Sequence, residues 1–264
     1  MAASLMLIAL VSAGAVIWML FFYGLRRATG NIGIIDIGWS WGVGLAALAC
    51  AGLGSGDPHR RLLLALLAGA WSFRLGFFLL RDRVFRGRED GRYLSLMTSW
   101  GEQAERRLFR LFMFQALFIV LFALPFLPVA GLARSLFTLW DVAAVFVWIM
   151  AVSGESVADR QLARWRADPG NKGHTCRSGL WHYSRHPNYF FEWLHWWTYV
   201  LLAAGSSWWC LTLLGPALMF YILYRVTGIP YNEAQSLKSR GEDYARYQRT
   251  TSAFFPWFPR REQD

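Results

Sequence analysis

Long apolar stretches separated by short basic segments dominate the amino-acid sequence. Each stretch is close to the roughly 20 residues that a helix needs to cross a bilayer. The pattern predicts an all-α, polytopic membrane protein with seven transmembrane helices, at residues 2–25, 32–53, 62–80, 108–130, 136–154, 189–205 and 207–226. The first stretch has no basic residue before it and is too long for the apolar core of a signal peptide, so we interpret it as a retained span.

The arginines and lysines between these stretches predict the orientation of the chain. Most of them fall on one side of the membrane: Arg26, Arg27, the clusters at 81–110 and 160–185, and the tail from Arg225. The other side carries Arg60, Arg61 and Arg134. Because cytoplasmic loops are enriched in Lys and Arg, we expect the N-terminus outside and the C-terminus in the cytoplasm.

Composition supports this class and limits the partners. The chain is 55% hydrophobic and 17% aromatic, and its net charge of +10 follows from the basic loops. No basic helix carries a free apolar face, so we expect membrane lipids and no nucleic acid among the partners. We favour a monomer in the inner membrane of a bacterium. The cysteines are isolated and the histidines lack metal-ligand spacing on a helix, so neither a disulfide nor a metal site is predicted.

The stretch at 178–199 carries the most distinctive pattern. Pro187 suits the first turn of a helix, because its missing N–H would have no helical partner there. Beyond it, polar residues recur every three or four positions and share one face of an otherwise apolar helix: Asn188, Glu192, His195 and Tyr199. A carboxylate is costly at membrane depth, so this stripe predicts a site rather than lipid contact. The alternative is a packing helix whose polar groups bond only to neighbouring helices.

Two further charges lie inside predicted spans. Asp36 is in the first turns of its helix and Arg74 is in the middle of the next, and intramembrane charges usually mark functional sites. Arg74 needs a counter-charge, for which Asp36 or Glu192 is the natural candidate. The loop at 81–93, which includes Arg88, alternates both signs around glycines and is typical of a phosphate-facing or lid segment. The simpler alternative is a solvated loop.

The end of the fifth predicted helix has a polar face. Glu155, Asp159, Leu162 and Arg166 recur at helical spacing. Carboxylates suit ribose hydroxyl groups and an arginine one or two turns further on suits a phosphate, so this face predicts a nucleotide contact. The alternative is a solvated extension stabilised by ion pairs. In the tail, the aromatic run at 254–258 predicts a return to the membrane interface.

Three stretches together resemble the steroid 5-alpha-reductase family, particularly its bacterial members: ESVADRQLARWR, GLWHYSRHPNYFFEW and SRGEDYARYQRTTSAFFPWFP. The likeness covers about residues 30–260 and is strongest over 150–260. It implies a seven-helix membrane reductase that binds NADPH at the cytoplasmic side. Such enzymes transfer hydride to a carbon–carbon double bond conjugated with a ketone, so a 3-oxo-4-ene steroid or similar lipid is the implied substrate.

The resemblance also implies the site residues. Those assigned to the cofactor are Arg88, Glu155, Asp159, Arg166, Tyr183, Arg185, His186, Asn188, Tyr189, Glu192 and Tyr244. Glu155 departs from the amide that often stands there in the steroid enzymes. Asp36 falls where the family carries a Glu that hydrogen-bonds the ketone, and the tyrosine partner of that Glu appears as Trp71 when Arg74 anchors the comparison. These three form the expected catalytic set.

We therefore expect a single transmembrane domain over 1–264, with a substrate cavity in 1–130 and NADPH bound by 136–264. A broader likeness extends to sterol reductases and to isoprenylcysteine carboxyl methyltransferases, which share the Arg-His-Pro-Asn/x-Tyr element. The methyltransferases bind S-adenosylmethionine, so membrane methyl transfer is the main alternative. A transporter would predict symmetric repeats or broken helices around a midplane site, and the sequence contains neither.

Overall fold

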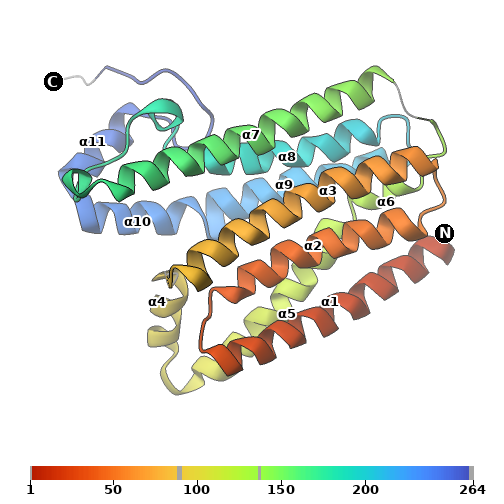
Figure 1. The fold of residues 1–264 in the computed structure, drawn as a ribbon, viewed down its shortest axis with the longest axis horizontal. Helices are drawn as coiled ribbons and strands as arrows, with labels where there is room; N and C mark the ends of the chain where they lie inside the picture. Colours follow the sequence, from red (N-terminus) through yellow and green to blue (C-terminus); the bar gives the residue numbers. More distant parts are fainter. Residues whose placement is uncertain (1, 88–90, 136–137, 262–264) are drawn as a thin grey trace. The chain divides into compact units, whose positions relative to one another are not determined.

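The computed structural model describes residues 2–87, 91–135 and 138–261, and helix is the only regular secondary structure within them (Figure 1). The α-helices are α1 (Ala2–Thr29), α2 (Ile34–Leu53), α3 (Pro58–Leu79), α4 (Gly91–Trp100), α5 (Ala104–Ala123), α6 (Phe126–Ala130), α7 (Leu139–Ala167), α8 (Pro187–Leu202), α9 (Leu214–Tyr221), α10 (Ile229–Arg240) and α11 (Glu242–Thr250). The π-helices are η1 (Leu80–Phe85) and η6 (Ile222–Val226), and the 3-10 helices are η2 (Gly101–Gln103), η3 (Pro169–Asn171), η4 (Gly179–His182) and η5 (Trp209–Leu213). The predicted all-α class is confirmed.

The protein is an integral, multi-pass membrane protein. Five helical segments of the described chain are long and apolar enough to cross a membrane: Ser4–Thr29, Ile34–Leu53, Pro58–Phe85, Leu139–Ala167 and Trp209–Arg240. Each overlaps a predicted span, although residues 136–137 of the predicted fifth span lie outside the described residues.

The two other predicted spans correspond to shorter helices. The stretch at 108–130 is divided between α5 and α6, because the helix is interrupted at Leu124 and Pro125. The stretch at 189–205 falls on α8, which has 16 residues and ends before the turn at Gly205, whose φ is 91°. Hydropathy averaged over a long window does not detect either helix end.

Two compact units make up the chain. Unit 1 comprises Met1–Thr138 and Leu202–Gly215, and unit 2 comprises Leu139–Leu201 and Pro216–Asp264. Unit 1 therefore holds α1 to α6, whereas unit 2 holds α7, α10, α11 and nearly all of α8.

Small residues determine the packing of α2 on α3 in unit 1. A Cβ at Gly44 would lie 2.1 Å from Ser72 Oγ, and one at Gly76 would lie 2.1 Å from the indole nitrogen of Trp41. The Ser72 hydroxyl donates to the carbonyl oxygen of Ser40 at 2.9 Å, and the Ser40 hydroxyl donates back to the Ser72 carbonyl at 3.2 Å. Close backbone approach and interhelical hydrogen bonds are the usual means by which membrane helices associate.

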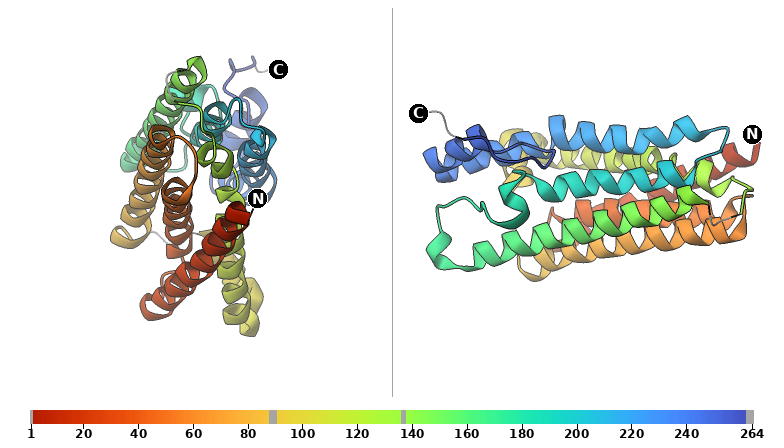
Figure 2. Two further views of the ribbon diagram at one scale, coloured as in Figure 1. Left: turned by 90° about the vertical axis from the view of Figure 1, so that its right-hand side faces the viewer. Right: turned by 90° about the horizontal axis from the view of Figure 1, so that it is seen from above.

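Helices α7 and α8 run side by side in unit 2 (Figures 1 and 2). Helix α8 begins at Pro187, as predicted. A Cβ at Gly154 of α7 would lie 2.4 Å from the ring of Phe191 on α8, so only glycine allows this approach. The loop at 168–186 and helices α10 and α11 gather at the C-terminal end of α7 (Figure 2).

Candidate functional site

The polar faces predicted on α7 and α8 meet within unit 2. The amide nitrogen of Asn188 donates to the Asp159 carboxylate at 3.3 Å. Glu155 and Glu192 are both buried, with 5% and 7% of their surface exposed. Deeper in α8, His195 Nε2 and the Tyr199 hydroxyl are 2.9 Å apart, and both residues are fully buried. Buried carboxylates and amides at membrane depth are the usual composition of a ligand site.

One buried acceptor of this seam lacks a hydrogen-bond partner. The side-chain carbonyl oxygen of Asn188 is buried and has no hydrogen-bond partner among the described residues. An unsatisfied buried acceptor costs about 1–3 kcal/mol. A ligand that donates a hydrogen bond, such as a hydroxyl or a carboxamide, would remove this cost.

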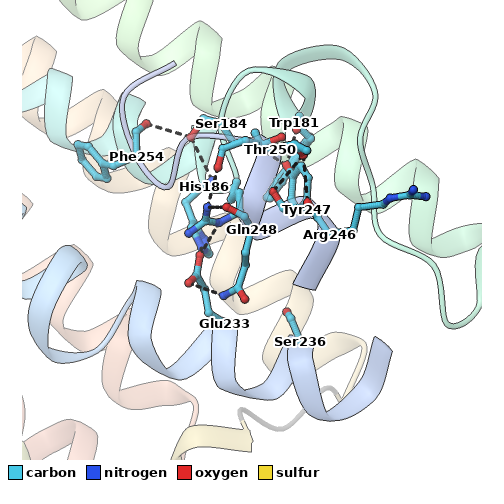
Figure 3. Close-up of polar contacts among 12 residues, drawn as sticks. Trp181, Ser184, His186, Glu233, Ser236, Arg246, Tyr247, Gln248, Thr250 and Phe254 are labelled. Carbon is cyan, nitrogen blue, oxygen red and sulfur yellow. Dashed lines mark hydrogen bonds and ion pairs between the residues drawn. The ribbon is translucent and has the colours of Figure 1, made fainter. Parts of the chain in front are cut away.

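A buried charge cluster lies at the start of α8 (Figure 3). Arg185 Nε donates to Glu233 at 2.7 Å, and its Nη1 donates to the carbonyl oxygens of Gln248 and Thr251 at 2.9 and 2.6 Å. His186 Nε2 lies 3.3 Å from the same Glu233 oxygen, and the Gln248 amide donates to the other at 2.8 Å. Arg185 and His186 thus join α8 to α10 and α11. Their contact with a cofactor stays a prediction.

The tail also holds the loop before α8 (Figure 3). The Ser184 hydroxyl donates to the carbonyl oxygen of Phe254 at 2.9 Å, and the Tyr247 hydroxyl donates to the carbonyls of Trp181 and Ser184. The Tyr183 carbonyl accepts from a backbone N–H in the aromatic run at 2.9 Å, and the Tyr183 side chain is exposed. The tail therefore positions the segment that carries the predicted cofactor residues.

Two more predicted residues, Tyr189 and Tyr244, lie in this region. The Tyr189 ring stacks on His186 with an interplanar angle of 6°, and its hydroxyl accepts a hydrogen bond from Asn232 at 2.5 Å. Burial, together with the Glu233 charge, raises the pKa of Tyr244 to about 12. Burial lowers the pKa of His186 below 6.5, although the adjacent Glu233 opposes this effect. His186 and Tyr244 are therefore uncharged near pH 7.

Arg166 lies at the other end of the same face of α7. It lines a pocket of about 310 Å³ at the C-terminal end of the helix, together with Leu162. The predicted α7 face therefore ends in an open pocket, and Asp159, two turns earlier, contacts Asn188.

Asp36 is the centre of a separate cluster in unit 1. Its carboxylate accepts hydrogen bonds from Arg83 of η1, from Arg92 at 3.1 Å and from the Tyr93 hydroxyl at 2.6 Å. Tyr93 is 8% exposed, and burial together with the Asp36 charge raises its pKa well above the ordinary value. The cluster joins α2, η1 and α4, and it holds one protonated hydroxyl beside an ion-paired carboxylate.

Comparison with known protein families decides the membership of the chain. The family described as "Protein of unknown function (DUF1295)" matches residues 22–251, which is most of the sequence. The protein belongs to the DUF1295 family. No curated protein and no solved structure matches it. The resemblance to steroid 5-alpha-reductases therefore rests on the sequence motifs.

The remaining predicted residues of the DUF1295 protein are placed as follows. Trp71 is fully buried, and its ring meets that of Trp39 edge to face, with centroids 6.3 Å apart. Two guanidinium nitrogens of Arg74 are buried within α3. Arg88 lies outside the described residues. Among the described residues, no three or more His, Cys, Asp and Glu side chains lie close enough to hold a metal ion, and the cysteines are free.

Sequence reasoning missed several residues of these clusters. Tyr93 was part of a loop interpreted only through its charges, and its position directly after Arg92 was the available signal. Glu233 is a single carboxylate in a polar tail helix, and no spacing distinguishes it from other surface acids. Its role depends on the fold, which brings it to Arg185.

Proposed function

We propose that the DUF1295 protein is an NADPH-dependent membrane reductase that acts on a carbon–carbon double bond conjugated to a ketone. Its substrate is lipid-like, with 3-oxo-4-ene steroids as the leading class. The observation that carries the proposal is the contact between Asp159 of α7 and Asn188 of α8, because it unites the two motifs that support the cofactor assignment. The proposal includes seven spans, an external N-terminus and a cytoplasmic C-terminus.

The residues of unit 2 fit a dinucleotide. Asn188 offers a buried acceptor, and the Asp159 carboxylate beside it suits ribose hydroxyl groups. Glu155 and Glu192 extend the polar seam into the membrane, where they would meet the nicotinamide end. Arg166 suits a phosphate group, because its planar guanidinium matches two phosphate oxygens at once. When bound, NADPH supplies the hydride for the reduction.

The residues of unit 1 would polarise the ketone. Charge that develops on a ketone oxygen during reduction is stabilised by a fixed hydrogen-bond donor. Asp36 accepts from two arginines and is therefore an acceptor in this cluster, whereas Tyr93 keeps its proton. We assign the donor role to the Tyr93 hydroxyl, whose single proton would turn from the Asp36 carboxylate to the ketone oxygen when the substrate binds, with Asp36 as the group that positions it. Trp71 and Arg74 stay proposed members of the substrate site.

S-adenosylmethionine-dependent methyl transfer is the second candidate, because the Arg-His-Pro-Asn/x-Tyr element is shared with those membrane methyltransferases. The two candidates differ in the charge of the cofactor. S-adenosylmethionine is a sulfonium cation without phosphate, so it offers Arg166 only its methionine carboxylate. A dinucleotide offers Arg166 several phosphate oxygens, which match its planar guanidinium.

Cofactor titration separates the candidates. The detergent-purified protein is titrated with NADPH, NADH and S-adenosylmethionine by calorimetry, and NADPH oxidation is then followed with a steroid enone while the product is identified by mass spectrometry. We expect NADPH to bind and the enone to gain two hydrogen atoms. Asn188→Ala should weaken NADPH binding, and Glu242→Gln, an exposed control, should not.

Two variants distinguish the residues needed for NADPH binding from those needed for turnover. Asp36→Asn should lower turnover more than NADPH affinity, and Arg166→Ala should do the reverse. Binding of S-adenosylmethionine without NADPH, or unchanged enone at wild-type NADPH occupancy, would reject the proposal.

A further inference from the structure

The pocket at the end of α7 contains more than the predicted Arg166. Its volume is about 310 Å³, and it is lined by the last turns of α7, the loop at 168–176 and the end of α10. The residues that define its chemistry are Leu162, Trp165, Arg166, Lys172, His174 and Arg240. All of them belong to unit 2, and only Arg166 is among the residues assigned to the cofactor from the sequence.

The pocket is strongly basic. Its lining holds three permanent cations, a histidine and one carboxylate, that of Asp168. The Asp168 side chain accepts from the backbone N–H of Gly170 at 2.9 Å, so it serves the turn that starts the loop. Arg240 is positioned by a hydrogen bond to Ser236 at 3.0 Å. Such a concentration of positive charge in one concavity favours a multiply charged anion.

The loop that carries Lys172 and His174 is fixed at both ends. At its start, the Asn171 side chain donates to the Trp165 carbonyl at 3.0 Å. At its end, the Thr175 backbone N–H donates to Asp243 at 2.7 Å. Between these anchors, Gly173 takes a φ of 85°, which only glycine adopts readily. The pocket is therefore preorganised, which reduces the entropy lost on binding.

Helix-end electrostatics explains only two of the three cations in the lining. Arg166 and Arg240 stand in the last turns of α7 and α10, where basic residues compensate the carbonyl ends of a helix. Lys172 and His174 stand on the loop, so that explanation does not apply to them. Their presence in the same lining as the two arginines points to a ligand.

We propose that this pocket binds a phosphomonoester dianion, and that in the enzyme this group is the 2′-phosphate of NADPH. The second part rests on the proposed function. NADPH carries this phosphate on its adenosine ribose and NADH does not. Arg166 and Arg240 provide planar forks and Lys172 a point charge for the phosphate, while Leu162 and Trp165 provide an apolar wall for the adenine ring. The pocket then sets the preference for NADPH over NADH.

Binding of nucleotide fragments tests the site without turnover. The full-length protein is titrated by calorimetry with 2′,5′-ADP and with 5′-ADP, which lacks the 2′-phosphate. We expect 2′,5′-ADP to bind more tightly, and Lys172→Gln and Arg240→Gln each to weaken it roughly threefold to tenfold, as for a partly exposed charge pair. Binding of 5′-ADP should change little in both variants.

Matched controls remove one charge of the same kind beside the pocket. Arg164 and Lys238 are exposed residues of the same two helices, and neither lines the pocket. Arg164→Gln and Lys238→Gln should leave 2′,5′-ADP binding unchanged. If they weaken it as much as Lys172→Gln and Arg240→Gln do, only the general positive field matters and the pocket assignment is wrong.

Competition identifies the source of the phosphate. Inorganic phosphate should displace 2′,5′-ADP at high concentration, and NADPH should displace it more effectively than NADH. Displacement by micelles that contain phosphatidic acid, with none by NADPH, would overturn the assignment in favour of a lipid headgroup.

The pocket and the reductase proposal can fail separately. If 2′,5′-ADP binds with the expected variant pattern but no enone is reduced, the pocket stands as a phosphate site and the proposed reaction is wrong. If the enone is reduced but Lys172→Gln and Arg240→Gln affect NADPH and NADH equally, the reaction stands and the pocket assignment is wrong.

Discussion

Replacing Arg185 with methionine should destabilise the end of unit 2 that holds α10 and α11 more than any surface charge change. Methionine keeps much of the side-chain volume but removes the three hydrogen bonds that reach Glu233, Gln248 and Thr251. The Glu233 carboxylate then loses its cation, and two backbone carbonyls lose a charged donor.

The magnitude follows from burial. The side chains of Arg185 and Glu233 are only 11% and 15% exposed, so water cannot replace the lost partner. Breaking a buried ion pair from one side costs about 3–5 kcal/mol. The control is Arg249→Met, whose ion pair with Glu242 is 54% and 79% exposed and should contribute less than about 1 kcal/mol.

Cysteine labelling measures the effect in one region at a time. Cys176 is buried in the loop that the tail holds, and Cys50 is buried in unit 1. Cys210 is exposed and is first replaced by serine. The detergent-solubilised protein is heated with a maleimide, and the labelled peptides are quantified by mass spectrometry. We expect Cys176 to become reactive at a lower temperature in Arg185→Met, with no change at Cys50.

A double variant adds a sharper criterion. Adding Glu233→Gln to Arg185→Met removes the unpaired buried charge, so part of the lost stability should return. Equal labelling temperatures for Cys176 in Arg185→Met and Arg249→Met would refute the reasoning from burial.

Three other predictions follow from the same structure. The pKa of His186 is lowered in the folded protein, so the unfolded chain takes up a proton near pH 6.5 before the folded chain does. The free energy of unfolding should therefore fall as the pH drops below 6.5. His186→Asn should reduce this pH dependence in thermal scans. Gly154→Val should lower the thermal midpoint by clashing with Phe191, and Phe191→Ala should partly restore it, whereas Gly14→Ala, with nothing within 4 Å, should be tolerated. Tyr93→Phe should reduce enone turnover by about a hundredfold with NADPH affinity unchanged, and wild-type turnover would remove Tyr93 from the donor role.

The local features of the fold could be predicted from sequence. Pro187 marks the start of α8 because its chemistry suits a first helical turn. The 3.6-residue period was enough to place Leu162 and Arg166 on one face, and both line one pocket. Hydropathy identified the long apolar helices. A helix start, a helical face and an apolar span are all properties of one continuous segment, so the local sequence is enough to predict them.

Contacts between distant segments could not be predicted in this way. The partners of Asp36 come from η1 and α4, and the natural candidate in the sequence was Arg74 of the neighbouring span. The path of the chain through η1 and α4 decides which arginines contact Asp36, and the spacing of charges in the sequence does not predict that path. Lys172 likewise becomes part of the pocket only because its loop folds back toward Arg240.

The length of α7 has a consequence for where chemistry can take place. Its 29 residues extend for about 43 Å, whereas the hydrocarbon layer is only about 30 Å thick. If its apolar start is level with one boundary of that layer, the last two to three turns project into the headgroup region. The pocket would then open to water while Glu155, about three turns back, remains at lipid depth. A single continuous helix would thus contact a water-soluble ligand at one end and a lipid-soluble ligand further along. The first ligand could stay in water and the second in the membrane.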